Sequence, residues 1–257
     1  MRVIALVNLK GGVGKTTTTI NIGAGLRQLG KKILLVDLDP QAHLTYSLGI
    51  PAHELKLTVY ELLKGESKLD KVVFKRKSTN SSSFIDVVPS SINLSGAEIE
   101  LSGMAGREFL LKEILEGLGG YDYVLMDCPP SLGVLTLNAL TSAQEAFIPL
   151  QTEYLALQGM AKLVEMVQLV KRRLNPGLEI TGIIGTRFHR RKKLNQEVVE
   201  KIKESFGNKL FSTLIRDNIA LAEAPSFGKT IFEYRPESAG AEDYMNLCKE
   251  ILQRGKP

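Results

Sequence analysis

The chain has 257 residues, 44% of them hydrophobic, and a formal net charge of +5. This composition supports a sizeable core in one domain over residues 1–257, and since no signal-peptide pattern precedes the first expected strand, we expect a cytoplasmic protein. A membrane-spanning protein is excluded because no uncharged apolar run reaches about 18 residues. The two cysteines, Cys128 and Cys248, stand at no spacing typical of a zinc site or a disulfide framework.

Short apolar runs alternate with helical patterns along the chain. Strands are expected at residues 3–7, 33–36, 84–88, 123–126, 146–150, 180–184 and 210–215, and helices at residues 16–29, 107–118, 132–143, 155–174, 195–206 and 239–253. This alternation predicts an α/β fold with a mostly parallel, twisted sheet that helices cover on both faces. Ligands then bind at the carboxyl ends of the strands. The polar run at residues 75–83 is expected to be an exposed loop.

A glycine-rich loop follows the first expected strand. It reads Lys10-Gly11-Gly12-Val13-Gly14-Lys15-Thr16-Thr17 and leads directly into a helical pattern. Glycines let backbone N–H groups converge on phosphate oxygens, while Lys15 adds positive charge and the Thr16 hydroxyl is a ligand for Mg²⁺. The flanking strand and helix favour a nucleotide site over a structural glycine turn.

Two later strands end in carboxylates. Asp37 and Asp39 follow one apolar run, and Asp127 follows another, just before two prolines. A site that hydrolyses a nucleotide needs carboxylates at strand ends to hold Mg²⁺ and to orient the attacking water. We predict that Asp127 is the Walker B carboxylate, that Asp39 positions water, and that Asp37 contacts the loop or the magnesium shell. The alternative for each residue is a turn at the end of its strand.

A strongly basic segment separates the strand expected at residues 180–184 from the helix expected at residues 195–206. It reads Arg187-Phe188-His189-Arg190-Arg191-Lys192-Lys193. Such a segment suits a polyanionic partner, and a solvated surface without a partner is the alternative.

Four motifs, in order, resemble the ParA/Soj family of chromosome and plasmid partition ATPases. Residues 10–17 match its deviant Walker A sequence, residues 36–41 its V-D-x-D-P-Q segment and residues 127–131 its D-x-P-P segment, while residues 221–229 are similar to its L-x-E-A-P-S-x-G-K segment. The likeness spans almost the whole chain. It implies a P-loop NTPase of the deviant Walker A type, with ATP or ADP and Mg²⁺ as cofactors and with weak basal ATPase activity. Since the first strand is expected to begin at once, we expect no N-terminal helix-turn-helix domain, and the chain is similar to the short members of the family.

The resemblance also implies a mechanism. ATP is sandwiched in a homodimer, in which Lys10 reaches the partner's phosphates and acts as a catalytic charge with Lys15 and Asp39. The ATP-bound dimer binds double-stranded DNA without sequence specificity, and a ParB/Spo0J-like centromere-binding protein stimulates hydrolysis. The family pattern thus predicts a nucleoid-associated protein that drives chromosome or plasmid segregation.

The chain departs from the family pattern I-P-R-N-V-R-L, where it has Arg216, Asp217 and Ala220 in place of the proline and the two arginines. Because a DNA-contacting arginine is lost at Ala220, we hypothesise that other cations bind the DNA phosphates: Arg190, Arg191, Lys192 and Lys193, helped by Arg216. Asn218 matches the residue that contacts adenine, since its amide offers both a donor and an acceptor. Its alternative role is to cap the helix that begins near Ala220.

Three other functions share parts of this pattern. A MinD-like ATPase that positions membranes or protein clusters has the same loop and aspartates, but it needs a C-terminal amphipathic membrane helix, whereas the apolar spacing of residues 244–257 suits packing against the domain. A nitrogenase-iron-protein-like electron donor needs paired cluster cysteines that this chain lacks. A kinase or ligase that uses the same loop would be favoured if DNA had no effect on turnover.

Overall fold

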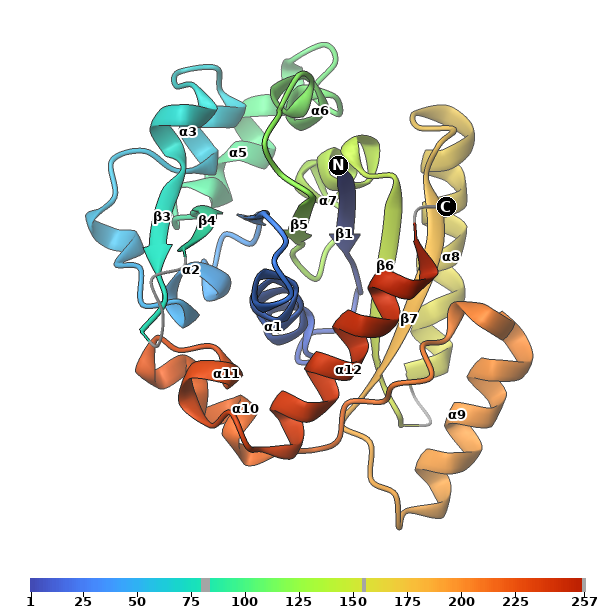
Figure 1. Ribbon diagram of the computed structural model, residues 1–257. Helices are drawn as coiled ribbons and strands as arrows, with labels where there is room; N and C mark the ends of the chain where they lie inside the picture. The colour runs from blue at the N-terminus through green and yellow to red at the C-terminus, as the bar shows by residue number, and fades with distance from the viewer. Residues whose placement is uncertain (80–83, 154–155, 256–257) are drawn as a thin grey trace.

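The strands form one seven-stranded sheet with the order β3-β4-β2-β5-β1-β6-β7 (Figure 1). A computed structural model describes residues 1–79, 84–153 and 156–255 of the chain. Its strands are β1 (Arg2–Leu6), β2 (Ile33–Asp37), β3 (Phe74–Lys77), β4 (Phe84–Val88), β5 (Tyr123–Asp127), β6 (Glu145–Gln151) and β7 (Glu179–Thr186). All pairs are parallel except β3 with β4. The predicted mostly parallel α/β sheet is confirmed.

Helices lie on both faces of this sheet. The helices are α1 (Lys15–Gln28), α2 (His43–Ser47), α3 (Val59–Leu63), α4 (Leu69–Val72), α5 (Leu94–Glu100), α6 (Leu110–Leu115), α7 (Val134–Ser142), α8 (Ala156–Arg173), α9 (Lys193–Phe206), α10 (Ile219–Glu223), α11 (Ile231–Tyr234) and α12 (Ala239–Arg254). Single 3₁₀ turns are η1 (Ala52–Glu54), η2 (Leu101–Gly103), η3 (Gly207–Lys209) and η4 (Ala224–Phe227).

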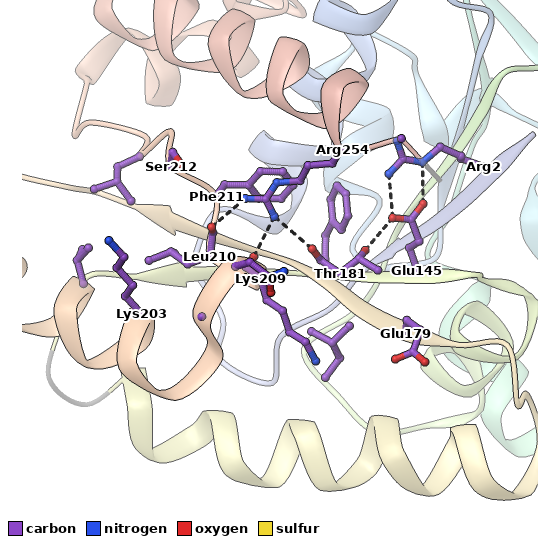
Figure 2. A pocket seen from close by; sticks show the side chains of 17 residues that line it. Arg2, Glu145, Glu179, Thr181, Lys203, Lys209, Leu210, Phe211, Ser212 and Arg254 are labelled. Carbon is purple, nitrogen blue, oxygen red and sulfur yellow. Dashed lines mark hydrogen bonds and ion pairs between the residues drawn. The ribbon is translucent and has the colours of Figure 1, made fainter. Parts of the chain in front are cut away.

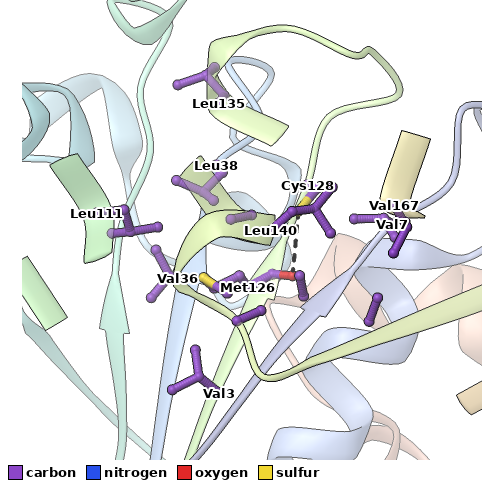
Figure 3. Packing of buried hydrophobic residues seen from close by; sticks show 14 of the residues in the cluster. Val3, Val7, Val36, Leu38, Leu111, Met126, Cys128, Leu135, Leu140 and Val167 are labelled. Carbon is purple, nitrogen blue, oxygen red and sulfur yellow. Dashed lines mark hydrogen bonds between the residues drawn. The ribbon is translucent and has the colours of Figure 1, made fainter. Parts of the chain in front are cut away.

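The strands bury both faces, so their side chains divide between two hydrophobic clusters. Val3, Val36 and Met126 pack with residues of α7 and α8 on one face (Figure 3). Their strand neighbours, such as Ile4 and Leu35, pack with residues of α1 and α12 on the other face. Since successive side chains of a strand point to opposite faces, a continuous apolar run is what a sheet covered on both faces requires.

The first and last long helices pack directly against each other. A Cβ at Gly25 of α1 would lie 2.6 Å from the Cys248 sulfur and 3.2 Å from the Phe232 ring. Nearer the phosphate loop, the hydroxyls of Thr18 and Tyr244 are 3.0 Å apart, within hydrogen-bond distance. A side chain at position 25 would not fit between the two helices, so the close contact needs Gly25. This packing against α12 holds α1 in place.

The strand predicted at residues 210–215 is wrong. The segment runs beside β7, but only the amides of Phe211 and Ile215 donate to β7, at 2.9 Å to Ile183 and 2.8 Å to Gly185. Between them, the carboxylate of Glu250 accepts from the amides of Ser212 and Thr213 at 2.8 and 3.0 Å. A side chain of α12 thus takes the hydrogen bonds that an eighth strand would need.

The loop predicted at residues 75–83 is also corrected in part. Lys75 to Lys77 belong to β3, where Arg76 is buried and its Nη1 lies 2.7 Å from a carboxylate oxygen of Glu233. The basic residues of this run predicted an exposed loop. The buried carboxylate of Glu233 pairs with Arg76, and this pairing allows a charged side chain to be buried in the edge strand β3. Residues 80–83 of the prediction lie outside the described residues.

The predicted helices all form, with changed ends. The largest change is α6, which covers only Leu110–Leu115 of the predicted 107–118. The structure also adds short helices that the sequence prediction lacked, notably α2 to α5 and α11, while α10 is the helix expected to begin near Ala220. Residue 155, the first of one predicted helix, lies outside the described residues.

Candidate functional site

The loop between β1 and α1 has the backbone shape of a phosphate cradle. Gly12 and Gly14 have φ angles of 72° and 91°, in the left-handed region where side chains are strained, and Gly14 is the N-cap of α1. A Cβ at Gly11 or Gly12 would meet no atom within 4 Å, so the loop is open on its outer side. No side chain caps α1, which leaves its first N–H groups available to an anion.

Lys15 lies inside this cradle and is 7% exposed. Its Nζ is 3.4 Å from the carbonyl oxygen of Lys10. Burial lowers the pKa of Lys15, while the negative charges of Asp127 and Asp39 oppose that change. A buried lysine beside open backbone donors is suited to receive a phosphate group.

Thr16 and Asp127, both predicted to hold a metal ion, are in direct contact. The hydroxyl of Thr16 donates to a carboxylate oxygen of Asp127 at 2.6 Å. Burial and the charge of Asp37 raise the pKa of Asp127 to about 8, against the opposing bond from Thr16. Asp127 also lies directly opposite Asp37 and Leu6 in the sheet register, so the ends of β1, β2 and β5 meet here.

Asp37 and Asp39 have different environments. The oxygens of Asp37, which is fully buried, accept from the amide and hydroxyl of Thr45 at 2.9 and 2.7 Å and from the amide of Asp39 at 3.1 Å. Burial raises its pKa to about 7. Asp39 instead faces the cavity described next, and its Oδ1 accepts from the amide of Gln41 at 2.9 Å. Asp37 therefore shapes the turn that presents Asp39, and its place in a magnesium shell stays a prediction.

A cavity of about 520 Å³ joins the phosphate loop to a segment near the C-terminal end of the chain. Gly11 to Thr17 form one wall together with Asp39, and residues 215–218, Leu221 and Ala222 form another. Asn218, the predicted adenine contact, lines this second wall, and its Oδ1 accepts from the amide of Ala220 at 2.9 Å. The capping role is thus confirmed, and the side chain also stands at the cavity, where an adenine contact stays a prediction.

The basic segment is joined to the same wall. The amide of Phe188 donates to Ile215 at 3.0 Å, and the amide of Asp217 donates to Phe188 at 3.2 Å. His189 adds a side-chain contact of 3.0 Å to Asp217. The exposed cations that follow, up to the first residue of α9, have no ion-pair partner in the described part of the chain: Arg190, Arg191, Lys192 and Lys193.

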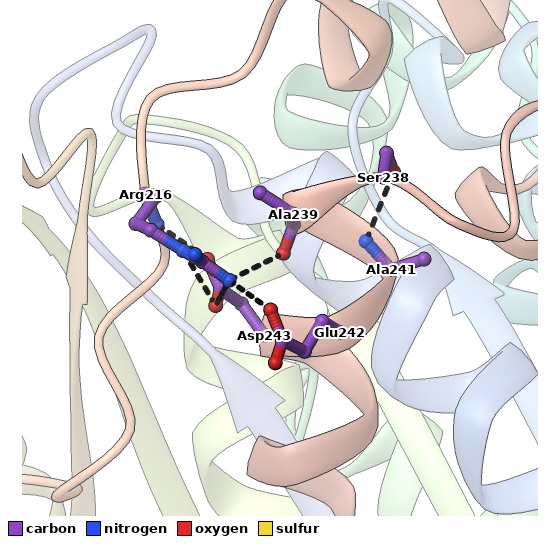
Figure 4. A network of polar contacts seen from close by, with 6 residues as sticks. All are labelled: Arg216, Ser238, Ala239, Ala241, Glu242 and Asp243. Carbon is purple, nitrogen blue, oxygen red and sulfur yellow. Dashed lines mark hydrogen bonds and ion pairs between the residues drawn. The ribbon is translucent and has the colours of Figure 1, made fainter.

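Arg216 differs from these four residues, because its charge is balanced within the chain. Its guanidinium lies 2.6 Å from Asp243 and 2.5 Å from Glu242, and Nη2 also donates to the carbonyl of Ala239 (Figure 4). These bonds raise the pKa of Arg216 further above its ordinary range. Arg216 ties the cavity wall to α12, and its predicted contact with DNA stays a prediction.

The sequence analysis did not identify two residues that contact the phosphate loop. The hydroxyl of Thr186 donates to the carbonyl of Val13 at 2.9 Å, and Gln151 donates to the carbonyl of Gly12 at 2.9 Å. Both stand at the ends of strands beside the loop, at positions that only the sheet order reveals. The rule that ligands bind at the carboxyl ends of strands was the one available indication.

A larger cavity, of about 1080 Å³, lies at the opposite end of the sheet, where β6 and β7 begin (Figure 2). Its buried charges are already paired: Arg2 lies 2.7 Å from Glu145, which also accepts from the hydroxyl of Thr181 at 2.7 Å. Arg254 donates to the carbonyl of Leu210 at 2.8 Å and lies over the Phe211 ring. These groups hold the fold together, so the smaller cavity at the phosphate loop is the candidate site.

The loop cavity also fits Mg²⁺ in the way that nucleotide sites hold it. No group of three or more His, Cys, Asp or Glu side chains arranged for a metal occurs among the residues that were searched, which are those the structure describes. Mg²⁺ needs only one or two protein ligands when substrate phosphates and water complete its shell, and the Thr16 hydroxyl and Asp127 supply these. Within the same part of the chain, no helix is long and apolar enough to cross a membrane.

Comparisons with known proteins agree with this geometry. Residues 1–180 match the family model described as an AAA domain. The sporulation initiation inhibitor protein Soj of Bacillus subtilis is 45% identical over 255 residues, covering 99% of each chain, and the chromosome-partitioning ATPase Soj of Treponema pallidum is 47% identical over 254 residues, covering 98% of each. A solved structure with bound ADP and magnesium, titled cobyrinic acid a,c-diamide synthase from Mycobacterium smegmatis, has a TM-score of 0.86 and 35% identity and covers 99% of this chain and 95% of its own.

Proposed function

This chain belongs to the ParA/Soj family of partition ATPases, and from that premise we propose that it is a nucleotide-controlled DNA-binding switch. In this proposal the ATP-bound form is a dimer that binds DNA without sequence specificity, and hydrolysis of ATP to ADP and phosphate dissolves the dimer. The match along nearly the full length of two Soj proteins supports the partition role. The family likeness of the first 180 residues alone would not distinguish it from other P-loop ATPases.

The nucleotide is held by the loop and its neighbours. The N–H groups at the start of α1 and the buried ammonium of Lys15 bind the phosphates, and Lys15 stabilises the negative charge that develops during transfer. Thr16 and Asp127 hold Mg²⁺ on the phosphate side. Bound Mg²⁺ supplies charge neutralisation at the phosphate oxygens. The relative with bound ADP and magnesium supports this pair of cofactors.

Asp39 orients the attacking water in this proposal. Its carboxylate lines the cavity, is 8% exposed and is fixed by the amide of Gln41. A carboxylate that is held in place but still open to the cavity can accept a hydrogen bond from water. Lys10 has an exposed side chain at the mouth of the loop, and we assign it the charge that reaches a partner's phosphates.

One observation supports the link between nucleotide and DNA: the basic segment is bonded through its backbone to a wall of the nucleotide cavity. Phe188 exchanges hydrogen bonds with Ile215 and Asp217, next to Asn218. The four unpaired cations that follow bind DNA phosphates, which is a contact without sequence information. Two such loops in one dimer bind more tightly than one, because the second binding event is intramolecular.

The remaining parts of the proposal follow from the family. A ParB/Spo0J-like protein stimulates the weak basal ATPase, and the chain works in the cytoplasm, associated with the nucleoid. Positioning of membranes or protein clusters, as in MinD-like proteins, is the competing function.

The proposal is tested by DNA binding at about 0.1 M salt, where phosphate contacts are not yet screened away. Binding to non-specific duplex DNA is measured without nucleotide, with ADP and with ATP, for the wild type and for Asp39→Ala, which is expected to retain ATP. We expect binding with ATP only, and stronger binding by the variant. Binding that is the same in all three nucleotide states would refute the switch and would favour a MinD-like role.

A further inference from the structure

The side chain of Lys10 is held against its own chain. Its Nζ donates to the Oε1 of Gln151 at 2.9 Å and lies 3.6 Å from a carboxylate oxygen of Glu153. The side chains of Lys10 and Glu153 are 44% and 53% exposed, so this contact lies at the open mouth of the loop. Neither Gln151 nor Glu153 belongs to any of the motifs that define the nucleotide site.

Gln151 also braces the loop itself. It is 4% exposed, and its amide nitrogen donates to the carbonyl of Gly12 at 2.9 Å while its amide oxygen receives Lys10. Two residues before Lys10, Asn8 makes a parallel connection. Its amide nitrogen donates to the carbonyl of Pro149 at 2.7 Å, and its amide oxygen accepts from the backbone amide of Lys10 at 3.0 Å. The end of β6 therefore fixes both the backbone and the side chain of Lys10.

We propose that Gln151 and Glu153 are positioning residues that keep Lys10 on its own chain until a nucleotide-bearing partner arrives. This inference rests on the proposed ATP-dependent dimer, in which the same ammonium turns to a partner's phosphates. Glu153 acts as a stand-in anion for those phosphates. Gln151 fixes the starting position of the Lys10 ammonium, because its amide nitrogen is itself held by the carbonyl of Gly12.

The contacts of Lys10 with Gln151 and Glu153 are weak enough for a partner's phosphates to replace them. An exposed ion pair shifts an equilibrium by about fivefold at most, so a triphosphate with several negative charges displaces Glu153 easily. The same modest attraction still has to be lost before the dimer forms. Glu153 thus raises the protein concentration at which ATP produces dimers.

The contact itself is measured by acylation of lysine amines in the nucleotide-free protein, with Lys192 as the exposed internal reference. An amine that donates to Gln151 and forms an ion pair with Glu153 is acylated more slowly than an exposed amine without such partners. We expect Glu153→Gln to raise the relative rate at Lys10 by about three- to fivefold at low salt, and about 0.5 M salt to remove the difference. Glu200→Gln, an exposed residue of α9 with the same change in charge, is the matched control and leaves the rate unchanged.

Dimerisation is measured by light scattering against protein concentration, with ATP and in an Asp39→Ala background to prevent hydrolysis. Glu153→Gln is expected to lower the concentration for half-maximal dimerisation by about three- to fivefold, and Glu200→Gln to leave it unchanged. An unchanged acylation rate, or a dimer that Glu153→Gln weakens, would overturn the inference. If acylation follows expectation but no variant dimerises with ATP, the dimer of the proposed function fails, and with it the regulatory part of the inference, while the contact of Lys10 stands.

Discussion

The hydroxyl of Thr16 donates a hydrogen bond to Asp127 at 2.6 Å, which joins the first turn of α1 to the end of β5. The two residues lie 111 positions apart in the chain. Both are proposed ligands of Mg²⁺, so the bond holds the two halves of a metal site together before any nucleotide binds.

Replacing Thr16 with alanine is expected to weaken nucleotide binding in the presence of Mg²⁺ by about tenfold or more, because the variant loses a ligand and the partner of Asp127. Calorimetric titration with ADP checks this, in Mg²⁺ and in EDTA. Thr16→Ser keeps the hydroxyl and is the control. An equal loss of affinity in EDTA would mean that Thr16 acts on the nucleotide or the fold rather than through the metal.

The stability of the metal-free protein is expected to fall as the pH rises. Burial raises the pKa of Asp127 to about 8 and that of Asp37 to about 7, whereas an unfolded carboxyl titrates near 4. Between these values the folded state binds more protons than the unfolded state, so the free energy of unfolding decreases with pH, by at most about 1.4 kcal/mol per pH unit for each carboxyl. Urea unfolding in EDTA at pH 5 and pH 8 measures this slope, and Asp127→Asn should make it shallower. A slope that Asp127→Asn does not change would contradict the assignment.

The buried pair of Arg76 and Glu233 is expected to respond to pH in the opposite sense. Burial by itself would raise the pKa of Glu233, but bonds from Arg76 and from the amides of Thr230 and Thr79 lower it to about 2. Stability from this carboxylate is complete above the unfolded pKa of about 4.3 and is lost as the pH falls toward 2. Glu233→Gln is expected to cost about 3 kcal/mol at neutral pH, since it leaves the Arg76 charge buried with its ion pair broken.

Thermal unfolding compares this variant with Glu66→Gln, which removes an exposed pair with Lys64 and should cost less than about 1 kcal/mol. Similar losses in the two variants would show that burial adds nothing to the pair of Arg76 and Glu233.

The contact between α1 and α12 is tested by paired glycine substitutions. Gly25→Ala places a methyl group 2.6 Å from the Cys248 sulfur, so we expect a loss of about 1–3 kcal/mol. Gly159→Ala is the matched change in the exposed part of α8, where a Cβ meets nothing within 4 Å, and it should stabilise by about 0.5–1 kcal/mol. Denaturant unfolding measures both, and a neutral Gly25→Ala would mean that the two helices move apart at little cost.

The basic loop is tested by charge reversal. We expect the double variant Arg190→Glu, Arg191→Glu to lose ATP-dependent DNA binding and to keep its nucleotide affinity, because both side chains are exposed and lie outside the cavity lining. Arg172→Glu, Arg173→Glu makes the same change at the far end of α8 and is the control. DNA binding that persists in the Arg190→Glu, Arg191→Glu variant, or that both double variants lose equally, would count against a specific role for this loop.

The residues predicted for the phosphate side of the site come together in the structure, and their signals are local in the chain. The loop from Lys10 to Thr17 lies between one strand and one helix, and Asp127 ends an apolar run, so each signal is read within a few residues. Parallel pairing then places Leu6, Asp37 and Asp127 side by side. The local sequence motifs and the order of the strands therefore predict the same location for the site, at the carboxyl ends of β1, β2 and β5.

The rest of the site depends on contacts between distant residues. Arg216 reads as a free cation, but Asp243 of α12 lies 2.6 Å away after folding. The apolar run at residues 210–215 reads as a strand, but Glu250 occupies two of its amides. Gln151 is an ordinary strand residue until the sheet places it beside Gly12. Such side-chain partners have no periodic signature in the sequence.

The side chain of Arg2 reaches from the first strand to the last helix, where its Nη1 donates to the carbonyl of Ile251 at 2.9 Å. A fragment ending at residue 180 would keep Lys15, Asp39 and Asp127 but would lose the cavity wall at residues 215–222. It would also uncover the Gly25 side of α1 and strip Arg2 of one buried partner. The residues proposed to bind the phosphates of ATP and to hydrolyse it lie in the first half of the chain, but the second half supplies one wall of their cavity and buried contacts to α1 and Arg2, so we expect the chain to fold as one unit.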